Sequence, residues 1–374
     1  MTEPWAYVAA LAGLDHMTTA RLNSLLRGRS AADAYALAVG DAAPTGAIAA
    51  MFERAPELRQ RWSTSASRHQ PDDVAQQCRE LGVSVVLPDD PSFPAALAGD
   101  PQRPAVLFVQ GDLCALDRRR VGIVGTRNPT QRGLQTAARF GHDLAAAGVA
   151  VVSGLAKGID GSAHRGALLA DDGSTVAIVA NGHDQPYPKR HEQLWREVAD
   201  RGAVVSEWPP GTPPDAFRFP QRNRILAALS EVVVVVESRE RGGSLITAQL
   251  AAERGVDVYA VPGDVSSRSS IGTNQLIGDG AAIATDPTVV LVALGLDGRR
   301  AGRRRYDARP LPRGVEAEAL AACRRTPQTV ESVALRGDWS LAEAALALAR
   351  LERSGWVCET GGWFEALDEW GDLC

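Results

Sequence analysis

The chain has 374 residues, of which 45% are hydrophobic and 23% are charged. This length and composition allow one large hydrophobic core with smaller modules beside it, so we expect a globular protein of two or three domains. The chain contains 40 lysines and arginines against 45 aspartates and glutamates, a formal net charge of −5. Because the whole chain is acidic, any site for a polyanion must be a local concentration of positive charge.

Several classes of protein are excluded by what the sequence lacks. Its five cysteines are scattered and never in CxxC spacing, which argues against a disulfide framework or a zinc site and fits a reducing cytoplasm. The six histidines show no metal-ligand spacing such as HExxH, so we expect no metal and no cofactor. No apolar run reaches about 18 residues, and no basic region precedes the short apolar run near the N-terminus. We therefore expect neither membrane insertion nor secretion.

Residues 1–70 carry apolar side chains at helical spacing, as at Leu22, Leu25 and Leu26, interrupted by Gly and Pro. This pattern predicts a small helical module. A helix-hairpin-helix reader of DNA needs a glycine hairpin between its helices, and this stretch offers only Gly13 for it. We therefore expect the module to pack against the rest of the chain rather than to contact DNA.

Over residues 71–296, short apolar runs alternate with helical patterns. Strands are expected over 83–87 and 105–110, and then near residues 121, 149, 175, 203, 232, 256 and 281. The alternation predicts an α/β fold, an extended Rossmann-like domain with a mostly parallel, doubly wound sheet. The segment EVVVVVES (231–238) is apolar at successive positions, which predicts a central strand that is buried on both faces.

Two further segments complete the chain. Residues 297–313 are basic, with Gly and Pro and no apolar period, which predicts a solvated linker with weak attraction for phosphate. Residues 314–374 show helical patterns followed by a hairpin across GWVCETGGWFEAL, an arrangement that resembles a winged-helix module. This module contains five arginines and no lysine against eleven acidic residues. We expect it to serve protein interaction or regulation rather than DNA binding.

The segment VAVVSGLAKGIDGSAHRGALL (149–169) combines a β-branched run, a glycine-spaced turn and an apolar helical pattern that begins near Ser162. It predicts a strand, loop and helix. Glycines such as Gly154 and Gly158 let a ligand approach the backbone, and the free N–H groups of the following helix form an anion site for phosphate. The alternative is that the turn serves helix packing alone. The spacing is neither GxGxxG nor a Walker loop.

Basic and aromatic side chains are expected at one edge of the sheet. Arg127 follows a buried strand, and Lys157 lies in the glycine-spaced loop, so both belong at the carboxyl edge, where open α/β folds bind ligands. For Ser153 and Asp160, turn formation and helix capping are as well supported as ligand contact.

The segment FRFPQRNR (217–224) interleaves phenylalanines with arginines, and YPKRH (187–191) adds Lys189. Unpaired bases stack on aromatic rings while guanidinium groups hold phosphates, the combination that single-strand binders use. Asn223 either reads a base edge or caps a helix. The predicted DNA-binding residues are Arg127, Ser153, Lys157, Lys189, Phe219, Arg222, Asn223 and Arg224. The predicted structural loop residues are Gly125, Gly154, Gly158, Asp160, Gly161, Gly242 and Gly243.

Six motifs resemble, in the same order, those of the DNA processing protein A family (DprA/Smf). They are VGIVGTRNPTQRG (121–133), SGLAKGID (153–160), GAVVSEWPPG (202–211), FPQRNRILAALS (219–230), GGSLITAQLAAERG (242–255) and VPGDVSSRSSIGTNQLIGDGA (261–281). The resemblance implies a cytoplasmic homodimer that binds single-stranded DNA without base preference, protects it during uptake and natural transformation, and hands it to the RecA recombinase. It also implies a SAM-like module in residues 1–70 and a winged helix in residues 314–374.

An enzyme is the main alternative. Nucleotide-processing enzymes on a related Rossmann-like fold, the lysine-decarboxylase-like phosphoribohydrolases, use a PGGxGTxxE motif whose glutamate takes part in catalysis. Here RGGSLITAQLAAE (241–253) lacks the second half of that motif, and Ser153 lies outside a GxSxG elbow. We therefore expect a binding protein with no catalytic residues. A purely structural scaffold would leave the clustered arginines unexplained.

Overall fold

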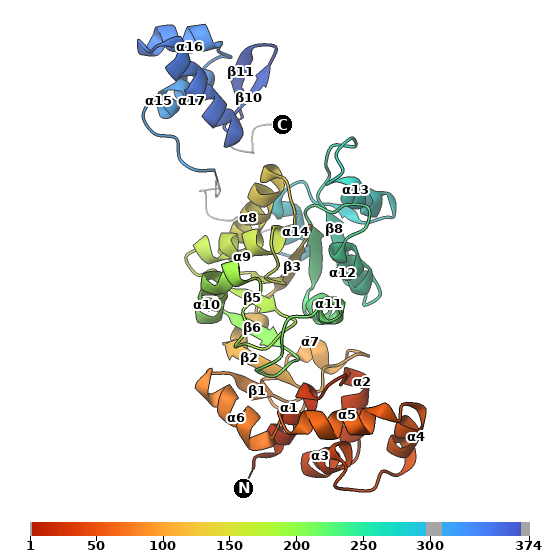
Figure 1. Cartoon of the computed structure of the whole chain (residues 1–374). Coiled ribbons are helices and arrows are strands. Elements are labelled where there is room, and N and C mark those ends of the chain that lie inside the picture. Colours follow the sequence, from red (N-terminus) through yellow and green to blue (C-terminus); the bar gives the residue numbers. More distant parts are fainter. Residues whose placement is uncertain (1, 297–308, 368–374) are drawn as a thin grey trace. The chain divides into compact units, whose positions relative to one another are not determined.

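The structure is a computed structural model that describes residues 2–296 and 309–367. The chain divides into two compact units, residues 1–302 and residues 303–374. Figure 1 shows the helices and strands of each unit, coloured along the sequence. Among the described residues, no helix is both long enough and apolar enough to cross a membrane. The described cysteines Cys78, Cys114, Cys323 and Cys358 are all free thiols.

The first unit begins with helices that share one apolar core. They are α1 (Pro4–Gly13), α2 (Thr19–Leu26), α3 (Ala31–Val39), α4 (Gly46–Arg54), α5 (Glu57–Ala66) and α6 (Pro71–Glu80). Leu11, Leu25 and Trp62 are fully buried in this core, which continues onto Phe108 of the neighbouring sheet. A Cβ atom on Gly13 would overlap the ring of His69, so this glycine serves close packing.

Within the described residues, nine strands form one sheet in the order β1-β2-β6-β5-β4-β3-β7-β8-β9. They are β1 (Ser84–Val86), β2 (Leu107–Gly111), β3 (Arg120–Val124), β4 (Ala150–Ser153), β5 (Thr175–Ile178), β6 (Ala203–Ser206), β7 (Val232–Val235), β8 (Asp257–Ala260) and β9 (Ala282–Ile283). Strand β2 pairs antiparallel with β1 and β6, and every other pair is parallel. The predicted α/β fold with a mostly parallel sheet is confirmed.

Helices cover both faces of this sheet (Figure 1). They are α7 (Ala95–Ala98), η1 (Leu113–Asp117), α8 (Gln131–Ala146), α9 (Ile159–Leu169), η2 (Lys189–His191), α10 (Glu192–Arg201), α11 (Arg218–Leu229), α12 (Gly243–Ala252), α13 (Ile271–Gly278) and α14 (Pro287–Ala293). Val232 and Val234 of β7 pack toward α8, α9 and α14, whereas Val233 and Val235 pack toward α11 and α12. The strand predicted from EVVVVVES is therefore buried on both faces.

The second unit contains three described helices and a hairpin, namely α15 (Val315–Cys323), α16 (Val330–Gly337), α17 (Leu341–Arg353), β10 (Val357–Thr360) and β11 (Trp363–Ala366). The expected hairpin is present, and the winged-helix assignment stays a prediction. Most of the predicted linker, residues 297–308, lies outside the described residues. At its end, however, Arg309 is buried, with its guanidinium 3.7 Å from the ring centroid of Trp356 and a 2.8 Å hydrogen bond to the Gly355 carbonyl. Arg309 is therefore packed, whereas Pro310, Leu311 and Arg313 are exposed, as a solvated linker predicts.

Helices α8 and α9 touch through their backbones, and this contact generates a test of stability. A Cβ atom on Gly166 would overlap the carbonyl oxygen of Ala138, and one on Gly141 would overlap that of Ala163. We expect Gly166→Ala to lower the free energy of unfolding by about 1–3 kcal/mol, because the helices must separate. Gly278→Ala in α13 is the control, since its Cβ would meet nothing within 4 Å. Urea unfolding measures both, and equal stabilities would contradict the backbone contact.

Two buried histidines generate a second test. His164 lies 2.7 Å from the hydroxyl of Thr175, and His183 lies 3.1 Å from the Val204 carbonyl. Burial lowers the pKa of His164 to about 3 and that of His183 to about 4. The unfolded chain takes up protons at both rings below about pH 6.5, whereas the folded chain does not, so stability falls as the pH falls from there toward about 4.

We expect each of these histidines to remove up to about 1.4 kcal/mol of stability per pH unit below about pH 6.5. Urea unfolding at about pH 7 and about pH 5 measures the effect. His164→Gln should make the free energy of unfolding depend less steeply on pH, because one of the two histidines no longer contributes. A dependence that is unchanged in a folded His164→Gln variant would show that this ring is not the source.

Candidate functional site

A pocket lies where the strand order of the sheet reverses. From β3 the chain proceeds through β4, β5 and β6 on one side and then returns to β7 on the other side of β3. Loops at the carboxyl ends of the strands diverge at such a switch point, where open α/β sheets bind ligands. The pocket has a volume of about 210 Å³ and is lined by Arg127, Asn128, Gly154, Ala156, Lys157, Val179, Ala180, Asn181, Tyr187, Phe219 and Arg222.

A larger cavity of about 590 Å³ adjoins this pocket and shares five lining residues with it, Arg127, Ala156, Tyr187, Phe219 and Arg222. It extends past the N-terminal half of α11 to the segment that follows β7 and the start of α12, where its lining includes Asn223, Arg239, Arg241, Gly242 and Ser244. We call the two cavities together the switch-point groove. Arg127, Lys157, Arg239 and Arg241 are exposed side chains along it.

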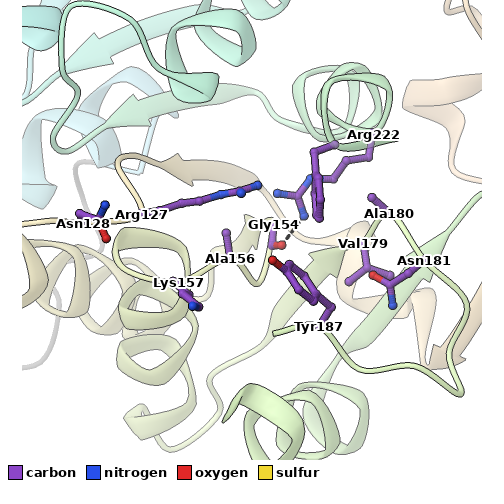
Figure 2. A pocket seen from close by; sticks show the side chains of 11 residues that line it. Arg127, Asn128, Gly154, Ala156, Lys157, Val179, Ala180, Asn181, Tyr187 and Arg222 are labelled. Carbon is purple, nitrogen blue, oxygen red and sulfur yellow. Dashed lines mark hydrogen bonds between the residues drawn. The ribbon is translucent and has the colours of Figure 1, made fainter. Parts of the chain in front are cut away.

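Aromatic rings and guanidinium groups meet at the centre of the groove. The ring of Phe219 lies 5.6 Å from that of Tyr187, between centroids, and the guanidinium carbons of Arg127 and Arg222 lie 4.7 and 5.8 Å from its centroid. Figure 2 shows Arg127, Tyr187 and Arg222 approaching one another from three different segments. The sequence predicted one patch at this sheet edge, made of Arg127, Lys157, Phe219, Arg222 and Arg224. The structure brings the first four together in the pocket, whereas Arg224 does not line the groove.

Arg222 is an anchor of the groove wall, with only 5% of the residue exposed. Its guanidinium donates to the carbonyl oxygens of Gly154 and Ile178, and it lies 3.8 Å from the carboxylate of Asp160. Burial lowers the pKa of Arg222 to about 10, so the side chain stays charged at neutral pH. A Cβ atom on Gly154 would overlap this guanidinium. Arg222 therefore ties the loop after β4 and the last residue of β5 to α11.

A buried carboxylate of the chain itself, that of Asp160, lies at the start of α9 beside the glycine-spaced loop, 3.8 Å from the Arg222 guanidinium. Burial raises the pKa of Asp160, while the charge of Arg222 and the backbone of Ala156 and Gly154 lower it. At the start of α8, the carboxylate of Glu237 accepts from the amide of Thr130 at 2.9 Å. Carboxylates of the chain thus stand at both helix starts, which favours the packing alternative for the loop.

Other predicted contact residues face inward. Ser153 is fully buried and donates to the Ile123 carbonyl at 2.6 Å. Arg224 forms a buried ion pair with Glu207 at 2.5 Å and donates to the hydroxyl of Thr19 at 2.9 Å. The sequence placed 222–224 at a helix start, but α11 begins at residue 218, so these residues lie in its second turn and are buried.

The remaining predicted residues divide between groove and packing positions. Asn223 donates to the Gly243 carbonyl at 3.3 Å and lines the groove, while Lys189 is exposed in η2 and does not line it. Gly125 faces Ile159, where a Cβ atom would come within 2.5 Å of Cγ1. Gly158 has a positive φ, and a Cβ atom on Gly161 or Gly242 would come too close to a neighbouring side chain. Gly243, by contrast, has open space around it.

The sequence analysis did not single out Arg239, Arg241 or Asn181. Arg239 and Arg241 follow β7 directly, and Asn181 follows β5. The rule that was applied to Arg127 after β3, that residues beyond a parallel strand reach the ligand edge, would have found all three. In the part of the chain that the structure describes, no three histidine, cysteine or carboxylate side chains are placed to hold a metal ion.

The family match covers the part of the chain that contains the sheet and the groove. The family model described as DNA recombination-mediator protein A matches residues 84–295. Protein Smf of Escherichia coli is 36% identical over 289 residues, which cover 75% of this chain and 77% of that protein. DNA processing protein DprA of Bacillus subtilis is 41% identical over 204 residues, 54% of this chain and 68% of that protein.

Similar solved structures include those of two DNA processing A proteins. DNA processing protein A from Streptococcus pneumoniae gives a TM-score of 0.64 at 31% identity, covering 78% of this chain and 98% of that one. The same protein from Helicobacter pylori, whose structure concerns its single-stranded DNA binding mode, gives 0.52 at 29% identity over 57% of this chain and 96% of that one. The fold, the motif order and these relatives agree, and the chain belongs to the DNA processing protein A family of recombination mediators.

Proposed function

We propose that this protein binds single-stranded DNA, without preference for base sequence, in the switch-point groove. The observation that carries the proposal is the Phe219 ring, packed beside Tyr187 and against the Arg127 guanidinium at the centre of a cationic groove. An aromatic ring stacks on any unpaired base, and exposed cations hold the phosphates that join the bases. A duplex hides its base faces, so this arrangement favours single strands.

We further propose that the protein acts in the cytoplasm as a homodimer that protects incoming single strands and loads RecA recombinase on them. The description of the matching family as recombination mediators supports a role between bare DNA and a recombinase. The relative from Helicobacter pylori is described as binding single-stranded DNA, which supports the same ligand for this chain.

Binding without catalysis fits the groove better than an enzyme does. Asp160 is buried and its carboxylate lies 3.8 Å from the Arg222 guanidinium, a position that suits a structural ion pair better than a catalytic base. Glu253, the glutamate of the motif segment compared with the phosphoribohydrolases, follows the end of α12 and does not line the groove. We therefore propose that the protein has no nucleotide hydrolase activity and no cofactor.

Gel-shift titration of matched single- and double-stranded oligonucleotides tests the proposed function. We expect clear binding of single strands of several sequences with similar affinity, and much weaker binding of duplexes. Four exposed groove cations predict a log-log salt slope near −3, because each contact on a single strand contributes about −0.7. No binding of single strands, or equal binding of duplex, would refute the proposal.

Two substitutions separate stacking from charge. Arg127→Ala should weaken binding and make the salt slope shallower by about 0.7, since one phosphate contact is lost. Phe219→Ala should weaken binding by about 1–3 kcal/mol without changing the slope, because it removes stacking and no charge. Arg196→Ala is the control, as this arginine pairs with Glu192 on α10 outside the groove. Identical behaviour of the two groove variants would contradict the assigned roles.

The second unit should contribute little to this affinity. Residues 1–302 form a compact unit that contains the whole groove, and residues 314–374 are acidic overall. We expect a chain that ends at residue 302 to bind single strands within about tenfold of the full chain, since the acidic module adds no phosphate contacts. Fluorescence anisotropy with a labelled oligonucleotide measures the ratio. A larger loss in a folded truncated chain would assign DNA contacts to the second unit.

A further inference from the structure

A second group of cations stands beside the switch-point groove. Lys157 follows β4, Arg165 lies on α9, and Lys189 and Arg190 lie in η2. All four side chains are exposed, and only Lys157 lines the groove. Among the described residues, none of the four forms a side-chain hydrogen bond or an ion pair.

His191 brings three of these cations together. Its Nδ1 lies 3.0 Å from the carbonyl oxygen of Leu155, two residues before Lys157, and a Cβ atom on Gly161 would lie 2.6 Å from its Cε1. Arg165 follows Gly161 by one helical turn, so it lies on the face of α9 that meets this ring. Arg190 is the neighbour of His191 in η2.

The electrostatics agree with this placement. Burial lowers the pKa of His191, and the charges of Arg165, Arg190 and Lys157 lower it further, although its hydrogen bond to Leu155 opposes them. The imidazole is therefore neutral at pH 7 and neither adds to nor offsets the cluster. Burial also lowers the pKa of Arg165, and repulsion from Arg190 lowers it further.

The carboxylate named beside Arg165 is already engaged in part. Glu197 raises the pKa of Arg165, and its Oε1 accepts a 2.8 Å hydrogen bond from Gln193. Like charges held close together repel, so an anion that binds between them relieves the repulsion and gains several attractions at once.

We propose that Lys157, Arg165, Lys189 and Arg190 form a phosphate track for the part of a DNA strand that leaves the switch-point groove. The inference rests on the proposed function, because Lys157 belongs to the groove and to the track and makes them continuous. A track of exposed cations without a stacking ring of its own holds the sugar-phosphate backbone and leaves the bases free. The ligand is therefore a strand longer than the groove itself holds.

Oligothymidylates of about 4 and about 16 nucleotides test the track, since the shorter fills only a groove-sized site and the longer extends past it. We expect the double variant Arg165→Gln, Arg190→Gln to bind the short oligonucleotide as the wild type does. On the long one its salt slope should be shallower than that of the wild type by about 1.4, because two contacts are lost. Arg196→Gln, on the neighbouring α10, is the matched control and should behave as the wild type at both lengths.

Two outcomes would overturn the track, and a third would refute the proposed function on which it rests. An unchanged slope on the long oligonucleotide, in a double variant whose thermal unfolding matches the wild type, would overturn it. An equal loss on short and long oligonucleotides would also overturn it, since the two arginines would then act within the groove. Absence of wild-type binding at either length would instead refute the proposed function itself.

Discussion

The buried guanidinium of Arg222 is the contact on which the geometry of the site depends. It reaches from α11 into the sheet edge, where it satisfies the carbonyl oxygens of Gly154 and Ile178 and lies beside the carboxylate of Asp160. Removal of this side chain would leave two acceptors and a charge buried without their partner, a far larger penalty than the loss of an exposed ion pair. Phe219, three residues earlier on α11, keeps its place at the centre of the groove because Arg222 fixes that helix against the sheet edge.

The arginines of the site fall into two groups that differ in exposure rather than in chemistry. Arg222 and Arg224 are buried and hold segments of the chain together, whereas Arg127, Arg239 and Arg241 are exposed along the groove. A buried arginine is already paired. If it turned to a ligand, the buried group that it pairs with would be left without a partner. In an acidic chain, the exposed group supplies the local positive potential, and the buried group supplies its rigid support.

Sequence patterns predicted the sheet well because they depend on local periodicity. The run at 231–238 is buried on both faces, and the loop after β3 brings Arg127 to the ligand edge, as the strand rule required. The predictions that differ depend on helix register and on contacts distant in sequence. The start of α11 at residue 218 turns Arg224 inward, and the buried carboxylate of Asp160 stands at the helix start that the pattern assigned to a phosphate. Neither fact is present in residue spacing, because each needs the position of another segment.

The ion pair between Arg224 and Glu207, with Thr19 of α2 beside it, also bears on how the protein can have diversified. The change in sequence pattern near residue 70 suggests an interchangeable part, yet Phe108 of the sheet completes the core of the N-terminal helices and Thr19 completes a polar contact inside the sheet domain. A recombination event that exchanged only the first 70 residues would have to replace complementary surfaces on both sides at once. Inheritance of this region is therefore tied to inheritance of the sheet, and new function is more readily acquired at the exposed groove loops than by exchange of the N-terminal helices.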